Sequence, residues 1–403
     1  MILPQELLNA IVQGIDDPST LKSCSLAGSS LREESQRILL HSLTLGVESH
    51  AAKSAILDES PHIATYIVDL TVYIPNPDEI VDLELTGADI QSILRRLQNV
   101  RRCVFDVPES SPSCVYWPEL PHAFSSTYLH FLSRQQSLRE LRIANVFELP
   151  LDVILSLLTA APTLILNRVG VVQDLRDSEL SLHHLPSLRR LILEPGCPRV
   201  CLCGLFARRQ YSPLTSGLTY LEIQASDHTV QENISIIANA AETLHSLRIE
   251  TERDVLSVLS VNGRQLITCP LPSLPALLSL EYVLPLSALT APWFLDAILE
   301  VLAPESNPKL TDLTLVFRYS NPTMRGFPSA IKVNAMSMLD AALAAHPASP
   351  CLKVRWNVDM ERFNVVFDYA QHFHKFVRMV QQAMPSAQVR GKLVVERVPL
   401  NVD

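Results

Sequence analysis

The amino-acid sequence predicts an α/β protein in which a short N-terminal three-helix module precedes an irregular leucine-rich-repeat solenoid with a parallel sheet on its concave face. Three observations predict this fold. A leucine phrase recurs along most of the 403 residues, amphipathic stretches lie between its copies, and residues 3–45 have the pattern of three short helices. A single core stops growing near ~250–300 residues, so this chain needs several domains or a repeat architecture.

The phrase is L-x-x-L-x-[LIY] after a turn-like residue, and its last four residues predict a strand. Leu141 and Ile143 alternate with Glu140 and Arg142, which gives that strand one buried face and one open face. The clear copies span 137–143, 187–193, 217–223, 243–249, 276–282 and 309–315. Looser copies span 39–45, 67–72 and 99–105, and weak copies lie at Leu164 and near Val354.

Amphipathic stretches between the copies predict helices at 88–97, 150–161, 232–241, 293–303 and 333–346. Pro150 suits the first turn of its helix. The copies start at residues 40 to 352 in ten steps, a mean spacing of about 31 residues that is typical of leucine-rich repeats. Such a unit cannot bury its apolar face alone, so neighbouring units must stack. We assign 46–349 to the repeats and 350–403 to a C-terminal capping segment, with a helix near 366–384 and a strand near 387–398.

A doubly wound α/β domain also alternates strand and helix, and it is the main alternative fold. The repeating phrase, the short strands and the lack of a glycine-rich turn after a strand favour the solenoid. Regular leucine-rich repeats place Asn or Cys three positions after the last Leu, where it ties the loops together. Here those positions hold Val146, Gly196, Ser226, Glu252, Pro285 and Arg318. We therefore expect uneven repeat lengths and variable curvature.

The N-terminal 45 residues predict three short helices with recognisable starts. Leu7, Leu8, Ile11, Val12 and Ile15 are spaced for one apolar face of the first helix. Residues 17–18, an aspartate followed by a proline, start the second helix as an acidic cap before proline. A serine at position 30 with a glutamate at position 33 fits a capping box for the third helix.

In its phrases LPQELLNAIV and DDPSTLKSCSLAGSSLREESQRILLHSLTL, this N-terminal module resembles the F-box. The similarity is to the F-box-like proteins with irregular leucine-rich repeats that are numerous in mushroom-forming fungi. It covers residues 3–45 by sequence and the remainder by architecture. The family usually has Trp where this chain has Leu31, which reduces the apolar area offered to a partner.

The resemblance implies a scaffolding role in an SCF-type cullin–RING ubiquitin ligase. The F-box would dock the Skp adaptor of the cullin complex, and the repeats would hold an unknown protein substrate. The residues that this assigns to adaptor binding, divided between the module's own core and the interface, are Leu3, Pro4, Leu7, Ile11, Leu21, Leu26 and Leu31. The alternative is a leucine-rich-repeat scaffold for protein interactions without a ligase role, whose N-terminal helices only cap the solenoid.

Composition and charge exclude several classes of function. The formal net charge is −9 and no long basic run occurs, so we expect no nucleic-acid partner. The N-terminus lacks a basic and apolar signal segment, so we expect a cytoplasmic or nuclear protein whose eight cysteines are reduced. The apolar stretches 153–172 and 276–302 are interrupted by proline and charged residues, so we expect no membrane span.

No catalytic motif is present, and we expect neither an enzyme nor a bound cofactor. There is no nucleophile elbow, Walker A loop or dinucleotide fingerprint. Three thiols lie close together in the sequence, at Cys197, Cys201 and Cys203. A structural zinc site requires four ligands, so we interpret them as ordinary thiols. His372 and His374 alternate on a predicted helix and face different sides. The arginine pairs, 95–96 among them, are interpreted as solvated charge.

Overall fold

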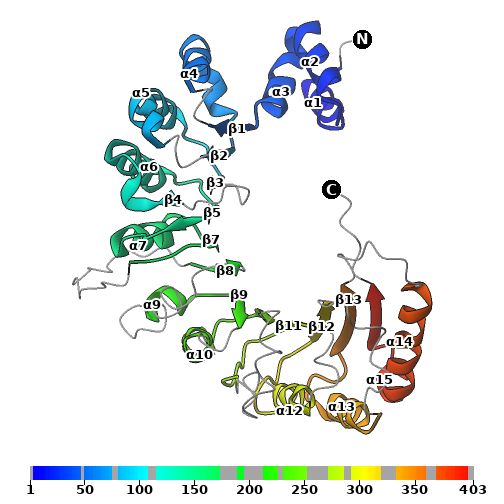
Figure 1. Cartoon of the computed structure of the whole chain (residues 1–403). Coiled ribbons are helices and arrows are strands. Elements are labelled where there is room, and N and C mark those ends of the chain that lie inside the picture. Colours follow the sequence, from blue (N-terminus) through cyan, green and yellow to red (C-terminus); the bar gives the residue numbers. More distant parts are fainter. Residues whose placement is uncertain are drawn as a thin grey trace. The chain divides into compact units, whose positions relative to one another are not determined.

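The computed structural model describes residues 3–46, 50–74, 80–107, 115–172, 188–194, 212–225, 230–251, 271–285, 292–318, 333–359 and 369–397. The chain divides into two compact units. Unit 1 comprises Met1–Leu188 and Pro195–Cys201, and unit 2 comprises Arg189–Glu194 and Leu202–Asp403. Both units are α/β with parallel strands, as the sequence predicts (Figure 1).

Unit 1 begins with three helices and continues as alternating strands and helices. Its elements are α1 Gln5–Gln13, α2 Pro18–Ala27, α3 Ser29–Leu39, β1 Ser42–Leu45, α4 His50–Glu59, the 3₁₀ turn η1 Pro61–Thr65, β2 Asp69–Tyr73, α5 Ile80–Arg96, β3 Arg102–Asp106, β4 Val115–Tyr116, the 3₁₀ turn η3 Trp117–Glu119, α6 His122–Arg134, β5 Glu140–Ala144, β6 Val146–Phe147, α7 Leu151–Ala160 and β7 Thr163–Asn167. Strands β1, β2, β3, β5 and β7 pair in this order, all parallel, while β4 and β6 form a separate parallel pair.

Unit 2 continues the alternation of strands and helices. Its elements are β8 Arg190–Glu194, α9 Ser212–Thr215, β9 Tyr220–Ala225, α10 Val230–Asn239, β10 Ser246–Thr251, β11 Ser279–Pro285, α12 Pro292–Val301, β12 Asp312–Arg318, α13 Val333–Ala345, β13 Lys353–Asp359, α14 Tyr369–Ala383, α15 Pro385–Val389 and β14 Leu393–Arg397. Strands β8 to β14 pair in sequence order, all parallel.

Copies of the leucine phrase stack in register. Leu221 pairs with Leu247, Leu247 with Leu280, Leu280 with Leu313, and Leu313 with Val354. All five side chains are at most 1% exposed, so the second apolar position of each phrase forms one continuous buried row in unit 2. The alternation predicted from sequence is therefore confirmed, because every second residue of these strands faces the core.

The helices α4 to α7 of unit 1, and those of unit 2, lie on one side of their strands, and neighbouring helices such as α4 and α5 or α12 and α13 pack together (Figure 1). In neither unit does the strand order reverse. A doubly wound sheet has helices on both faces and a reversal of strand order, so this arrangement differs from it. The polar residues of the phrases lie on the opposite face of the sheet. Strands β3, β5 and β7 begin at residues 102, 140 and 163, so the predicted unevenness of the repeats is confirmed.

A repeated hydrogen-bond joint connects successive strands at their amino ends. The Leu278 carbonyl accepts the backbone N–H groups of Thr311 at 2.9 Å and of Asp312 at 3.0 Å. The carbonyls of Val68, Arg101, Arg189, Thr219 and His245 likewise accept two N–H groups each from the next strand. Side-chain hydroxyls add to the joint, since Thr311 Oγ1 donates to Leu278 O at 3.1 Å and Thr243 Oγ1 donates to Leu218 O at 2.9 Å.

Regular leucine-rich repeats have Asn or Cys after the carboxyl end of each strand to tie the loops together. In this chain, other residues make some of these hydrogen bonds. Buried Asn145 has a left-handed backbone with φ of 58°, a conformation that asparagine tolerates, and its Nδ2 donates to Val107 O of the preceding repeat. Thr251 Oγ1 donates to Val283 O of the following repeat at 3.2 Å. These two residues lie outside the position that the regular pattern specifies.

Two local predictions are wrong. Helix α3 begins at Ser29 behind Gly28, without a side-chain cap, so the predicted capping box from Ser30 does not form. The extended backbone of Gly28 lets α3 start directly after α2. Pro150 is the residue before α7 and not within its first turn. Helices α4 and α6 were not predicted at all.

The strand predicted near 387–398 is also wrong in its first half. Helix α15 occupies Pro385–Val389, and the strand begins only at Leu393. Asp340 of α13 is buried, and its carboxylate accepts the backbone N–H groups of Ser386 and Ala387, both at 2.9 Å. This side chain caps the helix from a distance of more than forty residues in sequence, so no local pattern could reveal it.

Candidate functional site

Helices α1, α2 and α3 form the predicted three-helix unit, in which α3 packs against both of the others (Figure 1). Val12 of α1 and Leu21 of α2 are buried and form its apolar centre. Asp17 caps α2 as predicted, since its carboxylate accepts the backbone N–H groups of Ser19 and Thr20. The hydroxyls of these two residues also donate to Asp17, and together these bonds hold the pKa of its carboxyl well below the usual range.

Two glutamines attach α1 to α3. Gln5 Nε2 donates to the Ser30 carbonyl at 2.6 Å, and Gln13 Nε2 donates to Glu34 Oε1 at 2.8 Å. Residues 5, 9, 12 and 13 thus lie on the side of α1 that faces the unit. Residues 7 and 11, four apart on α1, lie on the other side. Val12 and the two glutamines hold the helix in place, and Leu7 and Ile11 are directed outward.

The predicted adaptor-binding residues differ in how far their side chains are exposed. Leu3 is 46% exposed, Leu7 51%, Ile11 56% and Leu26 82%, while Pro4 is also exposed. Leu21 is buried in the centre of the unit, and Leu31 is half-buried on α3. Leu7 and Ile11 lie on α1, Leu3 and Pro4 directly precede its first residue, and Leu26 lies near the end of α2. We call the residues Leu3, Pro4, Leu7 and Ile11 the α1 surface.

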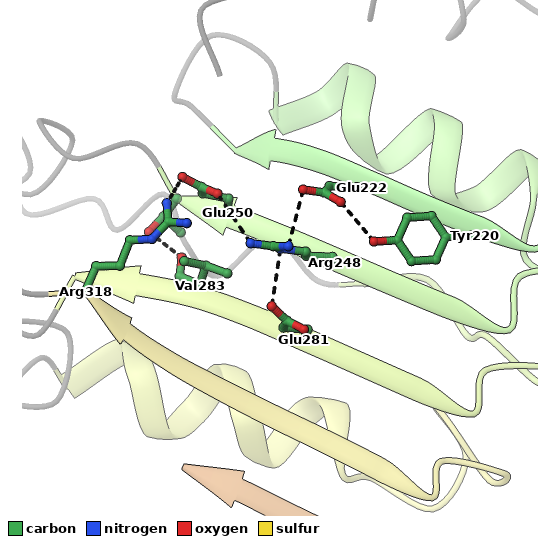
Figure 2. A network of polar contacts seen from close by, with 8 residues as sticks. Tyr220, Glu222, Arg248, Glu250, Glu281, Val283 and Arg318 are labelled. Carbon is green, nitrogen blue, oxygen red and sulfur yellow. Dashed lines mark hydrogen bonds and ion pairs between the residues drawn. The ribbon is translucent and has the colours of Figure 1, made fainter. Parts of the chain in front are cut away.

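A second polar arrangement lies on the sheet face of unit 2 that the helices leave uncovered, and we call it the Arg248 network (Figure 2). Arg248 of β10 lies between Glu222 of β9 and Glu281 of β11. Its Nη1 is 3.6 Å from Glu222 Oε1 and its Nε is 3.3 Å from Glu281 Oε1. Glu250 Oε2, two residues along β10, is 4.0 Å from Arg248 Nη2. Glu250 also pairs with Arg318 of β12.

The network continues toward β8 through an aromatic side chain. The Tyr220 hydroxyl donates to Glu222 Oε2 at 2.9 Å, and the Arg190 guanidinium lies 4.1 Å from the centre of the Tyr220 ring. Burial and the nearby Glu222 carboxylate raise the pKa of Tyr220 to about 12. Burial alone would lower the pKa of Arg248, but the carboxylates of Glu222, Glu281 and Glu250 outweigh it and raise this pKa. Near neutral pH, Arg248 therefore stays positively charged and Tyr220 keeps its hydroxyl proton.

The network was not predicted from the sequence, although the sequence contains a signal for it. Glu222, Arg248 and Glu281 occupy the same position of three consecutive phrases, between the second and third apolar residues. Because the strands pair in register, these positions are neighbours across the sheet. Opposite charges at one phrase position in consecutive copies therefore predict a cross-strand ion pair. In chemical terms, the network presents fixed charges on a rigid surface, which suits recognition of a partner.

The remaining candidate sites are only partly within the described residues. Cys197, Cys201 and Cys203 lie outside them, and His374 is exposed on α14. In the described part of the chain, no three His, Cys, Asp or Glu side chains are grouped as a metal site requires. None of the described helices combines the length and apolar character that crossing a membrane requires.

Comparison with known proteins adds no family assignment. No protein-family model matches the chain, and no curated protein sequence is similar to it.

Proposed function

We propose that this chain is a substrate-recognition adaptor of an SCF-type cullin–RING ubiquitin ligase. In this proposal, α1–α3 are an F-box that docks a Skp adaptor, and the leucine-rich repeats bind a protein substrate. The chain itself performs no catalysis, because ubiquitin transfer belongs to other subunits of such a ligase. It would act in the cytoplasm or the nucleus, where these ligases assemble.

The α1 surface is the observation that supports the docking role most directly. Leu7 and Ile11 are each more than half exposed, although the same unit buries Val12 and Leu21. Apolar anchors at positions i and i+4 of a helix are the pattern with which amphipathic helices enter a partner's groove. Full burial of a Leu or Ile contributes ~1.5–3 kcal/mol, so these half-exposed side chains would contribute a part of that each on docking.

The repeats support the second half of the proposal. Their strands hold charged side chains such as Glu222, Arg248 and Glu281 at fixed cross-strand positions on a face that the helices do not cover. Stacked repeats provide extended binding surfaces of this kind. Outward residues differ from one repeat to the next, which suits selection of a particular partner. A scaffold without a ligase role would have the same repeats, so docking by α1–α3 is the feature that separates the two functions.

The test is capture of the full chain by a purified fungal Skp adaptor. Replacing Leu7→Asp together with Ile11→Asp should reduce the affinity at least tenfold, because two anchors would become charged. Ile56→Asp on α4 is the matched control: Ile56 is 51% exposed, as Leu7 is, but lies outside the α1 surface. This control should bind normally. If the unmodified chain does not bind the adaptor, the ligase role is excluded and the scaffold remains.

A further inference from the structure

Strand β14 is the last of the parallel strands in unit 2, and among the described strands it pairs with β13 alone. Val354 of β13 lies opposite Leu393, and Trp356 lies opposite Val395, so these two β14 side chains face the core side of the sheet. Both remain partly exposed, whereas Val354 and Trp356 are at most 1% exposed. The difference arises because no described repeat follows β14 and covers it.

The surface at this end of unit 2 is apolar. Leu393, Val394 and Val395 are three consecutive, partly exposed apolar residues, and Val389 in the preceding helix α15 is 88% exposed. Terminal repeats of a solenoid normally present a polar outer face, which keeps the protein soluble. A strand with an open edge and apolar side chains is instead the kind that pairs with another chain.

The pairing with β13 shows which backbone groups of β14 are directed to the open edge. The Val354 N–H donates to the Lys392 carbonyl at 2.9 Å. Alternate residues of a parallel strand bond to the same neighbour, so the even-numbered residues of β14 direct their backbone groups toward β13. The N–H and C=O groups of Leu393 and Val395 therefore point to the open edge, where a further strand can bond to them.

The sequence of β14 is complementary to itself when two copies run antiparallel about a two-fold axis at Val394. Leu393 of one copy then lies opposite Val395 of the other, and these two residues exchange both backbone bonds. Lys392 likewise lies opposite Glu396, and symmetry makes each pair occur twice. Directly opposite side chains interact on one face, so apolar meets apolar and opposite charges meet. An axis at Val395 would instead place Val394 opposite Glu396.

The charges beside the strand agree with this register. The pairing of β13 with β14, continued by one residue before Leu393, places Lys353 next to Lys392. Among the described residues, neither lysine has an ion-pair partner, and Glu396 has none either. Glu396 of a second copy would lie beside these two like charges and offset their repulsion.

Strand β1 of unit 1 also has an edge that does not pair with β2, but a lysine occupies it. The His41 carbonyl bonds toward β2, so the Thr44 carbonyl, three residues further, points to the opposite edge. Lys53 Nζ donates to this Thr44 carbonyl. A lysine on an edge strand is a common protection against pairing with another chain. Pairing of β14 with β14, which closes on itself, is thus favoured over pairing of β14 with β1, which would continue as a filament.

We propose that two copies of this chain form a two-fold dimer through antiparallel pairing of their β14 strands, with Lys392 of each copy beside Glu396 of the other. The two sheets then continue into one another. The helices of both copies lie on the same side of the joined sheet, because directly opposite residues share a face. This dimer does not depend on the proposed ligase role.

Sedimentation velocity of the full chain over a range of concentrations tests the proposal. The mass should rise with concentration from 44.9 kDa toward twice that value. Lys392→Glu alone and Glu396→Lys alone should each weaken the dimer roughly tenfold, because like charges then lie opposite each other at two places. Lys309→Glu and Glu305→Lys, each tested singly, are the matched controls. Both residues are exposed and precede β12, so these variants should dimerise as the unmodified chain does.

Mixing Lys392→Glu with Glu396→Lys gives the sharpest result. One variant then has carboxylates at both positions and the other has ammonium groups at both, so every contact between the two has opposite charges. The mixture should form a one-to-one dimer at a concentration where neither variant dimerises alone, which also shows that both are folded. A chain that stays at 44.9 kDa throughout, single variants that dimerise normally, a monomeric mixture or masses above two copies would overturn the proposal.

Discussion

Arg248 shows how a single side chain can serve both the fold and a binding surface. It contacts carboxylates on its own strand and on both neighbouring strands, and it is 29% exposed. Glu222 and Glu281 would otherwise face each other across one strand with like charge. Phrase position reveals this arrangement once the register is known, but the sequence alone does not give the register.

Replacing Arg248→Gln should destabilise unit 2 by roughly 1–3 kcal/mol. The full cost of breaking a buried pair is larger, but partial exposure allows solvent to screen the remaining carboxylates. Urea unfolding would measure the change. Arg102→Gln is the control, because Arg102 forms one exposed pair with Glu140 at 2.9 Å and should cost under ~1 kcal/mol. Equal costs for the two variants would contradict the role given to the network.

His346 is a buried histidine whose hydrogen bonds fix its neutral form. The Ala348 N–H donates to Nδ1 at 3.2 Å, so Nε2 carries the proton and donates to the Asn307 carbonyl at 3.0 Å. Burial lowers its pKa, although the bond to Asn307 opposes this. Sequence could not identify the residue, because nothing local to it signals a partner 39 residues away.

The lowered pKa of His346 predicts a loss of stability in acid. The unfolded chain binds the proton near pH 6.5, whereas the folded chain binds it only at lower pH. The contribution of His346 is therefore complete above about pH 6.5 and decreases as the pH falls below it. His346→Gln should show a smaller drop in the urea midpoint between about pH 7.5 and about pH 5 than the unmodified chain. Parallel drops in the two proteins would show that His346 does not titrate in this range.

Among the elements, the strands could be predicted from the sequence far better than the helices. Most strands have a phrase whose apolar positions are buried, so spacing alone specifies them, whereas β4, β6 and β14 have no phrase. Helix α6 was missed although Phe124, Tyr128 and Phe131 face the core with helical spacing. The outward direction of Leu7 and Ile11 was also not predictable, because an apolar stripe does not say whether its partner belongs to the same chain.

The joint at the amino ends of the strands predicts that the conservative substitution of Thr by Val lowers the stability of the chain. Thr311→Val and Thr243→Val should each destabilise the chain by about 1 kcal/mol, because the hydroxyl bonds to the preceding repeat are lost. Thr159→Val is the control, since the Thr159 hydroxyl bonds only within its own helix, to the Ser156 carbonyl at 2.9 Å. Thermal unfolding would compare the three. If Thr159→Val destabilised the chain as much as the other two variants, the hydroxyl bonds between repeats would not contribute more to stability than a bond within one helix.

At the scale of the whole chain, the two units each have their own core, and the buried Cys103 reports on the core of unit 1. Cys103 is fully buried in unit 1 beside the Tyr128 hydroxyl at 3.5 Å, and burial raises the pKa of its thiol to about 12. Cys351 of unit 2 is exposed. The division into two units was not predicted, because the leucine phrase continues through both with similar spacing.

A thiol-specific reagent should therefore modify Cys351 in the folded protein and leave Cys103 unmodified. Only the thiolate reacts, and Cys103 is both inaccessible and protonated. In rising urea, Cys103 should become reactive together with the unfolding of unit 1. Peptide mass spectrometry after timed labelling would follow both sites. Rapid labelling of Cys103 in the absence of urea would contradict the packing described for β3 and α6.

The paired N–H bonds to carbonyls such as that of Leu278 leave the length of the connecting segment unspecified. The joint forms in the same way where a repeat has many residues and where it has fewer, as the starts of β3 and β5, at 102 and 140, and of β9 and β10, at 220 and 246, illustrate. Insertions and deletions in the connectors can thus accumulate without disturbing the backbone bonds that order the strands. The connectors can therefore change, and with them the binding preference of the chain, while the hydrogen bonds that hold the strands together stay the same.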